Sequence, residues 1–260
     1  MRIVRFATQG RIKYGALKND TIHGIQGSPF SQGKNHAIMI KLDGNIYDSR
    51  EVKLLAPCLP SKIVCLGLNY RSHAKEFNLP IPSVPLIFLK PSTAIIGPDS
   101  EIILPRFSKR IDYEGELGIV IGKKAKDISE NHAKEYVLGY TCFNDVSDRH
   151  AQKEDGQWTR AKGYDTFAPL GPWIETEINP DDLKVETYLN GDLRQSTRTS
   201  DLIFNTAKLI SFISGIMALL PGDVIATGTA SGIGRMNPGD VVEVKIENIG
   251  TLKNFVIKQD

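Results

Sequence analysis

The chain has 260 residues, of which 41% are hydrophobic and 24% are charged, and its formal net charge is only +2. A chain of this length and composition can bury a sizeable core and fold unaided. Its near-neutral charge provides no strong field to favour nucleic acid or an anionic membrane surface as a partner.

The first 58 residues have the pattern of a small β-rich module. Short runs of β-branched and aromatic residues, separated by turn residues, predict strands at Arg2–Phe6, Lys13–Leu17 and Ile22–Ile25. Pro57 and Pro60 flank Cys58, which is typical of a connector. We therefore predict a boundary near residue 58, with a β module over 1–58 and a larger domain over 59–260.

The larger domain is predicted to be mostly β. Strand signals recur at Lys62–Gly67, Leu86–Lys90, Ile102–Leu104, Tyr113–Ile121, Gly139–Asn144, Leu183–Leu189, Asp223–Thr227, Val241–Ile246 and Thr251–Ile257. Helices are predicted at Glu130–Leu138, capped by Ser129, and at Thr206–Leu219, capped by Asn205 and ended by Pro221-Gly222. Because strands and helices do not alternate, the pattern disfavours a doubly wound sheet and predicts a mixed, β-rich α/β fold with few helices.

The cysteines and apolar runs predict a cytoplasmic protein. Cys58, Cys65 and Cys142 are odd in number, show no CxxC spacing and lie in apolar surroundings, where a buried, inert thiol is usual. The longest apolar run, Phe212–Leu220, is too short to span a bilayer. The N-terminus lacks the pattern of a signal peptide, so we expect neither export nor membrane insertion.

Two glutamates enter an apolar strand two residues apart. Alternation along the strand places Glu114 and Glu116 on one face, where their charges need a counter-charge. A divalent cation supplies one, and an all-oxygen ligand set suits Mg²⁺, Mn²⁺ or Ca²⁺ better than zinc. A solvated strand edge is the alternative, although Gly115 and Gly118 favour close approach of another group to the backbone.

A third ligand is expected at the end of the apolar strand that precedes Asp145. Asp148 and His150 compete with it, because a loop site made by Asp145, Asp148 and His150 is conceivable. We favour Asp145 as the ligand and interpret His150 as a bystander. A surface ion pair with Arg149 explains Asp148 as well as metal binding does.

Two further segments carry candidate catalytic groups. If Asn69 caps a helix, His73 and Glu76 lie at i, i+3 on one face, and a carboxylate beside an imidazole favours a general base near neutral pH. Lys162 lies between bulky residues, where a partly desolvated lysine near a metal could stabilise an enolate. An ordinary surface pair and a solvated lysine are the respective alternatives.

The segment Thr227–Gly234 is rich in glycine but does not match a nucleotide-binding loop, because no GK[ST] ending is present. Its backbone N–H groups and the Thr229 hydroxyl are candidates for holding a carboxylate. An ordinary β-turn is the alternative.

Seven segments in this order resemble those of the fumarylacetoacetate hydrolase family over about residues 60–257. They are Gly67-Leu68-Asn69-Tyr70 with His73 and Glu76, Phe88-Leu89-Lys90-Pro91-Ser92, Glu114-Gly115-Glu116-Leu117, Asn144-Asp145-Val146 with Arg149 and Gln152, Ala161-Lys162-Gly163, Phe167-Ala168-Pro169-Leu170-Gly171-Pro172, and Thr227-Gly228-Thr229 with Gly232 and Gly234. The resemblance implies the family's β-roll or sandwich core, usually in a homodimer. The first 58 residues resemble the small N-terminal module of some bacterial members.

The resemblance also implies roles for nine residues. It implies Mg²⁺ or Mn²⁺ on Glu114, Glu116 and Asp145, a catalytic dyad of His73 and Glu76 on a lid, an active-site lysine at Lys162, and substrate contacts from Arg149, Gln152 and Thr229. The lid would span Asn69–Pro85, whose three prolines predict a loose segment that orders over substrate.

Members of the family hydrolyse acylpyruvates, decarboxylate oxaloacetate-like acids or isomerise 2-hydroxydienedioates, in each case with a metal as Lewis acid on a 2-oxo acid. Our leading hypothesis is an enzyme acting on a 2-oxo or 2-hydroxy-enoic dicarboxylic acid, in the 2-hydroxyhepta-2,4-diene-1,7-dioate isomerase and decarboxylase branch. The alternatives are an acylpyruvate hydrolase and a non-catalytic binder of metal or carboxylate.

Two positions depart from the family pattern. Leu68 stands where some relatives carry a basic residue, and His150 follows Arg149 where an aspartate is common. The motifs therefore predict how the 2-oxo acid end of the substrate is recognised, but not the chemistry of its other end.

Overall fold

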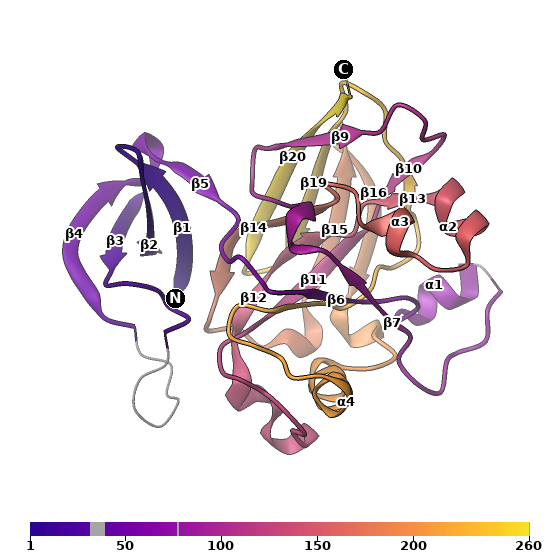
Figure 1. The fold of residues 1–260 in the computed structure, drawn as a ribbon, viewed down its shortest axis with the longest axis horizontal. Helices are drawn as coiled ribbons and strands as arrows, with labels where there is room; N and C mark the ends of the chain where they lie inside the picture. The colour runs from indigo at the N-terminus through magenta and orange to yellow at the C-terminus, as the bar shows by residue number, and fades with distance from the viewer. Residues whose placement is uncertain (32–39, 77, 260) are drawn as a thin grey trace.

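The computed structural model describes residues 1–31, 40–76 and 78–259. These residues form a mixed, β-rich fold, as the sequence predicts, with four α-helices among twenty strands. A small lobe of N-terminal strands lies beside a larger lobe that contains the helices (Figure 1).

The N-terminal lobe is a meander of antiparallel strands. Its strands are β1 (Arg2–Thr8), β2 (Arg11–Lys18), β3 (Thr21–Ile25), β4 (Leu42–Asp48) and β5 (Lys53–Leu55). β1 also pairs with β14 (Ala168–Glu175), with Arg2 opposite Glu175, and the N-terminal ammonium lies 2.8 Å from a carboxylate oxygen of Glu175. The sheet of this lobe is therefore continuous with the main sheet of the larger lobe.

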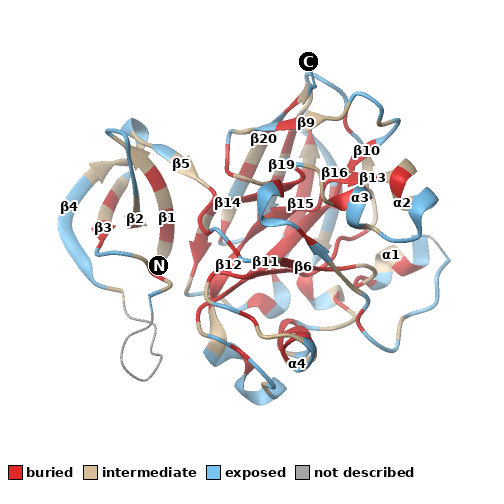
Figure 2. Ribbon diagram, viewed as in Figure 1, coloured by how far each residue is buried: buried red, intermediate tan, exposed pale blue. Residues whose placement is uncertain are grey.

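The main sheet runs in the order β4-β3-β2-β1-β14-β12-β11-β17-β6-β7. Its remaining strands are β6 (Ile63–Leu66), β7 (Ile87–Lys90), β11 (Gly115–Ile121), β12 (Val137–Asn144) and β17 (Val224–Ala226), and β8 (Ile95–Ile96) pairs with β14. Every residue of β11 is buried, which explains why its sequence is continuously apolar after Glu116 (Figure 2).

Two further sheets complete the larger lobe. One contains β9 (Glu101–Leu104), β15 (Lys184–Leu189), β16 (Asp192–Arg198), β19 (Val241–Ile246) and β20 (Gly250–Lys258). The other contains β10 (Ile111–Tyr113), β13 (Ser147–Asp148) and β18 (Gly234–Arg235). The predicted strand Tyr113–Ile121 is thus split at Glu114, with β10 in the small sheet and β11 in the main one.

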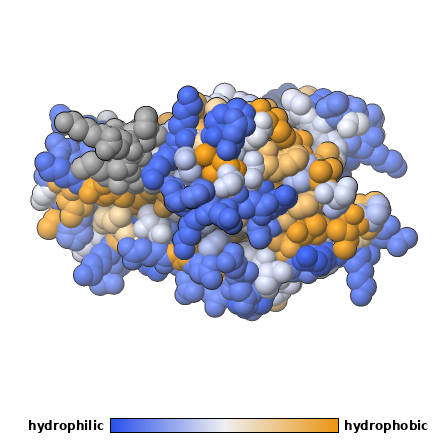
Figure 3. All heavy atoms as spheres, turned by 90° about the horizontal axis from the view of Figure 1, so that it is seen from below, coloured by the Kyte–Doolittle hydropathy of each residue, from blue (hydrophilic) through white to orange (hydrophobic). Residues whose placement is uncertain are grey.

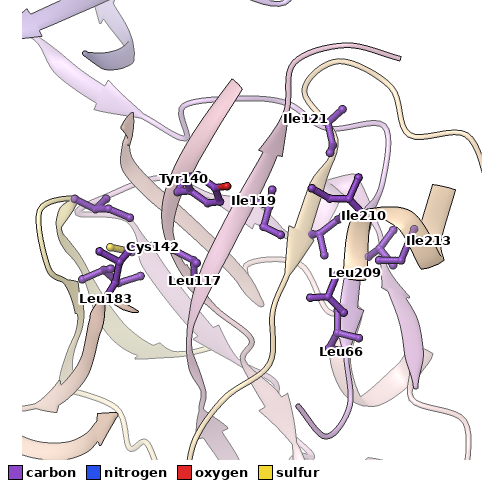
Figure 4. Close-up of a cluster of buried hydrophobic side chains, with 14 of the residues drawn as sticks. Leu66, Leu117, Ile119, Ile121, Tyr140, Cys142, Leu183, Leu209, Ile210 and Ile213 are labelled. Carbon is purple, nitrogen blue, oxygen red and sulfur yellow. The ribbon is translucent and has the colours of Figure 1, made fainter. Parts of the chain in front are cut away.

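The largest core cluster lies between the main sheet, the β15–β19–β20 sheet and the helix α4 (Thr206–Ile216). Leu117 and Ile119 of β11 belong to it with Leu209, Ile210 and Ile213 of α4 (Figure 4). Each fully buried side chain of this size stabilises the fold by about 1.5–3 kcal/mol. This packing holds β11 in place against the core.

The helices are short. The α-helices are α1 (Arg71–Glu76), α2 (Arg149–Asp155), α3 (Thr159–Lys162) and α4 (Thr206–Ile216), and the 3₁₀ turns are Ser49–Glu51, Ser92–Ala94, Glu130–Tyr136, Pro180–Asp182 and Thr199–Asp201. No helix of the described residues is long and apolar enough to cross a bilayer.

Three helix predictions need correction. Asn205 caps α4 through Lys208 N, as expected, but the helix ends three residues before Leu219, because Leu219 exchanges two 2.9 Å backbone hydrogen bonds with Ala125. The segment Glu130–Tyr136 is a 3₁₀ helix, and the Ser129 side chain forms no capping hydrogen bond.

The third correction concerns Asn69, which does not cap α1. Its side-chain amide donates to Thr227 O at 2.7 Å and to Phe204 O at 3.1 Å, and it accepts from Phe204 N at 2.8 Å. Asn69 therefore links the segment that follows β6 to two loops that are distant from it in sequence.

The sequence prediction missed β14, whose Pro169, Gly171 and Pro172 are typical of turns, and β16, in which most residues are exposed. It was correct for the cysteines, since all three are free and buried. Burial raises the pKa of each thiol.

Candidate active site

Three carboxylates from neighbouring strands meet at one end of β11. Glu114 lies at the break between β10 and β11, Glu116 is the second residue of β11, and Asp145 follows β12. Antiparallel pairing of Gly115 with Asn144 brings Asp145 beside Glu114, and Asp145 N donates to Glu114 O at 2.9 Å. One oxygen of each carboxylate lies within 4.8 Å of the others, and all three residues are buried.

Three cations surround the carboxylates. The Lys162 ammonium at the end of α3 lies 2.8 Å from Glu114 Oε2 and 2.6 Å from Asp145 Oδ2. Lys90, at the end of β7, donates to the other Asp145 oxygen, and Arg149, at the start of α2, donates to Glu114 Oε1. Lys90 is fully buried, and no role was predicted for it, although it lies within one of the motifs.

Glu116 is the carboxylate that these cations leave least satisfied. Its Oε2 accepts from Gly228 N at 2.8 Å, whereas its buried Oε1 has no hydrogen-bond partner among the described residues. Burial, together with the charges of Asp145 and Glu114, raises the pKa of Glu116 well above its usual range. Burial acts in the same direction on Glu114, but Arg149 and Lys162 outweigh it and lower the pKa of Glu114.

This donor set fits a divalent cation. An unsatisfied, buried carboxylate oxygen beside two further carboxylates needs a positive charge, and oxygen donors alone are typical of Mg²⁺ and Mn²⁺ sites. The loop that contains Gly228 binds a carboxylate, as its sequence suggested, but that carboxylate belongs to the protein.

The competing ligands are engaged elsewhere. Asp148 caps α2 by accepting from His150 N at 3.0 Å and Ala151 N at 3.1 Å, and it accepts from Ser108 Oγ at 2.6 Å. His150 lies on the surface with its Nε2 3.1 Å from a Glu154 oxygen. Asp148 is therefore a helix cap, and the predicted surface pair with Arg149 is not formed.

The candidate dyad is assembled on α1. His73 Nδ1 lies 3.2 Å from Glu76 Oε2, and Glu76 Oε1 accepts from Gly232 N at 3.3 Å. Burial lowers the pKa of His73 below its ordinary value of 6.5, although the Glu114 and Glu76 carboxylates oppose this shift. The imidazole is therefore neutral at pH 7, in the form that accepts a proton.

A pocket of about 500 Å³ opens in front of Glu114. Its polar lining residues are His73, Glu114, Arg149, Gln152 and Lys162, and its other lining residues are Gly67, Leu68, Leu79, Pro80, Pro82, Leu86, Trp158 and Ile233. Five residues predicted from the sequence thus line one cavity.

Thr229 is placed differently from the other candidate substrate contacts. Arg149 Nη1 donates to Gln152 Oε1 at 2.8 Å, and both residues line the pocket. Thr229 is buried outside the lining, where its hydroxyl donates to Gly115 O at 3.0 Å and accepts from Gln195 Nε2 at 2.9 Å. Because a hydroxyl has only one proton, Thr229 has none left to donate to a substrate in this arrangement.

The family model described as "Fumarylacetoacetate (FAA) hydrolase C-terminal" matches residues 62–257, and a model described as "Rv2993c-like, N-terminal" matches residues 1–57. The chain belongs to the fumarylacetoacetate hydrolase family. Relatives in this family are isomerases, hydrolases and tautomerases.

Three relatives illustrate the range. The 2,4-didehydro-3-deoxy-L-rhamnonate hydrolase of Sphingomonas sp. (strain SKA58) is 44% identical over 278 residues, covering 98% of this chain and 96% of the relative. The structure of 2-hydroxyhepta-2,4-diene-1,7-dioate isomerase from Mycobacterium marinum is 43% identical, with a TM-score of 0.91 and coverage of 100% and 99%. Maleylpyruvate hydrolase from Sphingobium sp. SYK-6, solved with manganese(II) and pyruvate, is 28% identical, with a TM-score of 0.82 over the whole of both chains.

No role was predicted for Gln195, which links the backbone between Glu114 and Glu116 to the loop that contains Gly228. Gln195 is the only fully buried residue of β16. Its Oε1 accepts from Gly115 N at 3.0 Å, and its Nε2 donates to Thr229 Oγ1 and Ala230 O, each at 2.9 Å. A buried glutamine in an otherwise exposed strand was the available signal.

We expect Gln195→Leu to raise the dissociation constant for Mn²⁺ by about 10- to 100-fold, because groups that orient metal ligands typically have effects of this size. Calorimetric titration with Mn²⁺ measures this. Asn254→Leu is the matched control: Asn254 is a buried amide on β20 that donates to Gly97 O at 2.9 Å and Ser100 O at 3.0 Å, away from the site. Both variants should lose stability, and equal Mn²⁺ affinity in the two would contradict the role of Gln195.

Proposed function

We propose that this chain is a metal-dependent enzyme that moves a proton on a 2-oxo or 2-hydroxy-enoic acid, as an isomerase or tautomerase. The observation that carries the proposal is the buried cluster of Glu114, Glu116 and Asp145, with its orphaned Glu116 oxygen, next to a pocket lined by His73. A Mg²⁺ or Mn²⁺ ion held by the three carboxylates would supply Lewis-acid polarisation of the 2-oxo and carboxylate oxygens.

Side chains of the pocket would carry out the proton transfer and stabilise the developing charge. Neutral His73, oriented by Glu76, would accept a proton from the carbon next to a 2-oxo group, or from the hydroxyl of a 2-hydroxy-enoic acid, and would return it to another carbon of the substrate or, in tautomerisation, to the 2-oxygen. The Lys162 ammonium stabilises the negative charge that develops on the substrate oxygens. Burial lowers the pKa of Lys162, but Asp145 and Glu114 raise it by more, so the ammonium remains charged.

An acylpyruvate C–C hydrolase is the second candidate, supported by the maleylpyruvate hydrolase relative. In that reaction His73 would take a proton from water instead of carbon. Loss of CO₂ in a decarboxylation needs neither of these two proton transfers, and the enolate that it leaves then takes up a proton on carbon. A non-catalytic binder is less well supported, since it would have no use for His73, Glu76 and Lys162 in one pocket.

A panel of 2-oxo and 2-hydroxy-enoic acids, tested with metal-free and Mn²⁺-loaded protein, separates these candidates. Ultraviolet change alone indicates isomerisation, release of pyruvate indicates hydrolysis, and release of CO₂ indicates decarboxylation. We expect metal-dependent ultraviolet change. Absence of all three signals, together with no binding of oxalate to the Mn²⁺-loaded protein, would contradict the proposal.

The segment that follows the dyad should order over bound ligand. Arg71 and Ser72 anchor the start of α1 to residues 201–202, so we propose a lid shorter than the predicted Asn69–Pro85. In residues 78–85, Leu79, Ile81 and Val84 are each more than half exposed. We expect faster amide exchange there than in β11, and slower exchange after addition of Mg²⁺ and oxalate. Equal protection with and without these ligands would show that the segment is already ordered.

A further inference from the structure

The pocket is lined by two chemically different sets of residues. The polar set contains Glu114 and the cations that pair with it, and the apolar set contains Leu68, Leu79, Pro80, Leu86, Trp158 and Ile233. Apolar residues also gather in patches on the face shown in Figure 3, most extensively on the side away from the grey residues.

The apolar lining residues include one ring of a packed aromatic pair. The Trp158 ring meets the Phe88 ring edge-on at a centroid distance of 5.1 Å. A Cβ atom added to Gly67 would lie 3.0 Å from Trp158 and 2.9 Å from Leu86, so both side chains lie directly against the Gly67 backbone. This packing places Trp158 and Leu86 in direct contact with the segment that follows β6.

Each basic group of the described lining residues has an acidic or amide partner. Arg149 donates to Asp112 through Nε, to Gln152 through Nη1 and to Glu114 through Nη2. Lys162 is held by Glu114 and Asp145, and His73 by Glu76.

We infer that the substrate has a single carboxylate, at its 2-oxo end, and an apolar tail that packs against Leu68, Leu86 and Trp158. The inference rests on the proposed function and names its substrate class. A second carboxylate on the tail would lie among apolar side chains, and every basic group of the described lining is already paired with an acidic or amide group, which opposes binding of a second charge. This departs from the dicarboxylic substrate that the family resemblance suggested.

Calorimetric titration of Mn²⁺-loaded protein with 2-oxoheptanoate and 2-oxoheptanedioate tests the inference without requiring turnover. The two acids have the same chain length and differ only in the terminal carboxylate. We expect 2-oxoheptanoate to bind about tenfold more tightly or better, and each methylene removed from its tail to weaken binding about fourfold. Turnover of 2,4-dioxoheptanoate and 2,4-dioxoheptanedioate should show the same preference in kcat/KM.

A charge placed among the apolar lining residues should change this preference. Leu86 lines the pocket and is 53% exposed, so Leu86→Arg adds a cation to the lining without disturbing the core, and we expect it to tighten 2-oxoheptanedioate binding about threefold to tenfold. Ile12→Arg adds the same charge at an exposed position of β2, in the other lobe, and should leave the ratio of the two affinities unchanged.

The outcomes separate this inference from the proposed function. Tighter binding of 2-oxoheptanedioate by the unmodified protein, or an equal response of the two arginine variants, would overturn the apolar tail and leave the metal-dependent reaction in place. If neither acid binds, both the inference and the proposed function are overturned.

Discussion

Replacement of Glu116 by glutamine is expected to weaken Mn²⁺ and Mg²⁺ binding by more than about 100-fold and to abolish turnover, while making the metal-free protein more stable. The change removes one of three ligand charges, so the metal effect should exceed the ~10- to 100-fold typical of groups that only orient ligands. Glutamine keeps an oxygen for the N–H group of Gly228, so the local backbone should be preserved.

The gain in stability follows from the sign of the pKa shift. The pKa of Glu116 is higher in the folded chain than its ordinary value of 4.5, so this group favours the folded state at low pH and destabilises it as the pH rises through 4.5 toward the folded value. At neutral pH the metal-free variant should therefore exceed the metal-free parent by roughly 1–3 kcal/mol, the usual cost of an unsatisfied buried group. Urea titration of both proteins in the presence of chelator measures this difference.

Asp145→Asn should lose metal affinity in the same way but with the opposite effect on stability, because it leaves the buried ammonium groups of Lys90 and Lys162 short of a partner. Glu186→Gln is the control, since Glu186 is a buried glutamate on β15 that pairs with Lys184 away from the site. Retention of full Mn²⁺ affinity by the Glu116 variant would show that Glu116 is not a ligand.

His73→Ala is expected to lower the rates of isomerisation and hydrolysis by about 10²- to 10⁴-fold, the usual contribution of a general base, and to leave Mn²⁺ affinity unchanged. The rate of decarboxylation should fall less. Because burial lowers the pKa of His73, the acidic limb of its pH–rate profile should lie below pH 6.5.

The chain contains a second histidine–glutamate pair with which to compare this effect. His132 Nδ1 lies 2.9 Å from Glu135 Oε1, also at i, i+3, but both side chains are exposed on the surface. His132→Ala should therefore have no effect on rate. Equal rates for the two alanine variants would mean that the His73–Glu76 pair is an ordinary surface contact.

Part of the carboxylate cluster could be predicted from sequence because it is local. The spacing of two residues keeps Glu114 close to Glu116, whereas Asp145 joins them only because β12, the strand that it follows, pairs with β11. The partners of these residues could not be predicted in the same way. Lys90 and Gln195 reach the site from other strands, and only the order of strands in the sheets brings them close.

The helix ends were misjudged for a similar reason. Residues 217–219 have an apolar pattern that suits a helix, but Leu219 is held by Ala125, almost a hundred residues away in sequence. Asn69 has the residue type and position of a cap, yet Phe204 and Thr227 bind its side chain. In both cases a long-range hydrogen bond outweighs a local preference, which sequence patterns do not record.

The most direct test of the metal assignment is anomalous diffraction at the manganese absorption edge, from crystals grown with Mn²⁺ and oxalate. The account predicts one strong peak within coordination distance of oxygens from Glu114, Glu116 and Asp145, with oxalate bound on its pocket side. A peak at Asp148 and His150 instead, or oxalate bound with no peak among the three carboxylates, would contradict it.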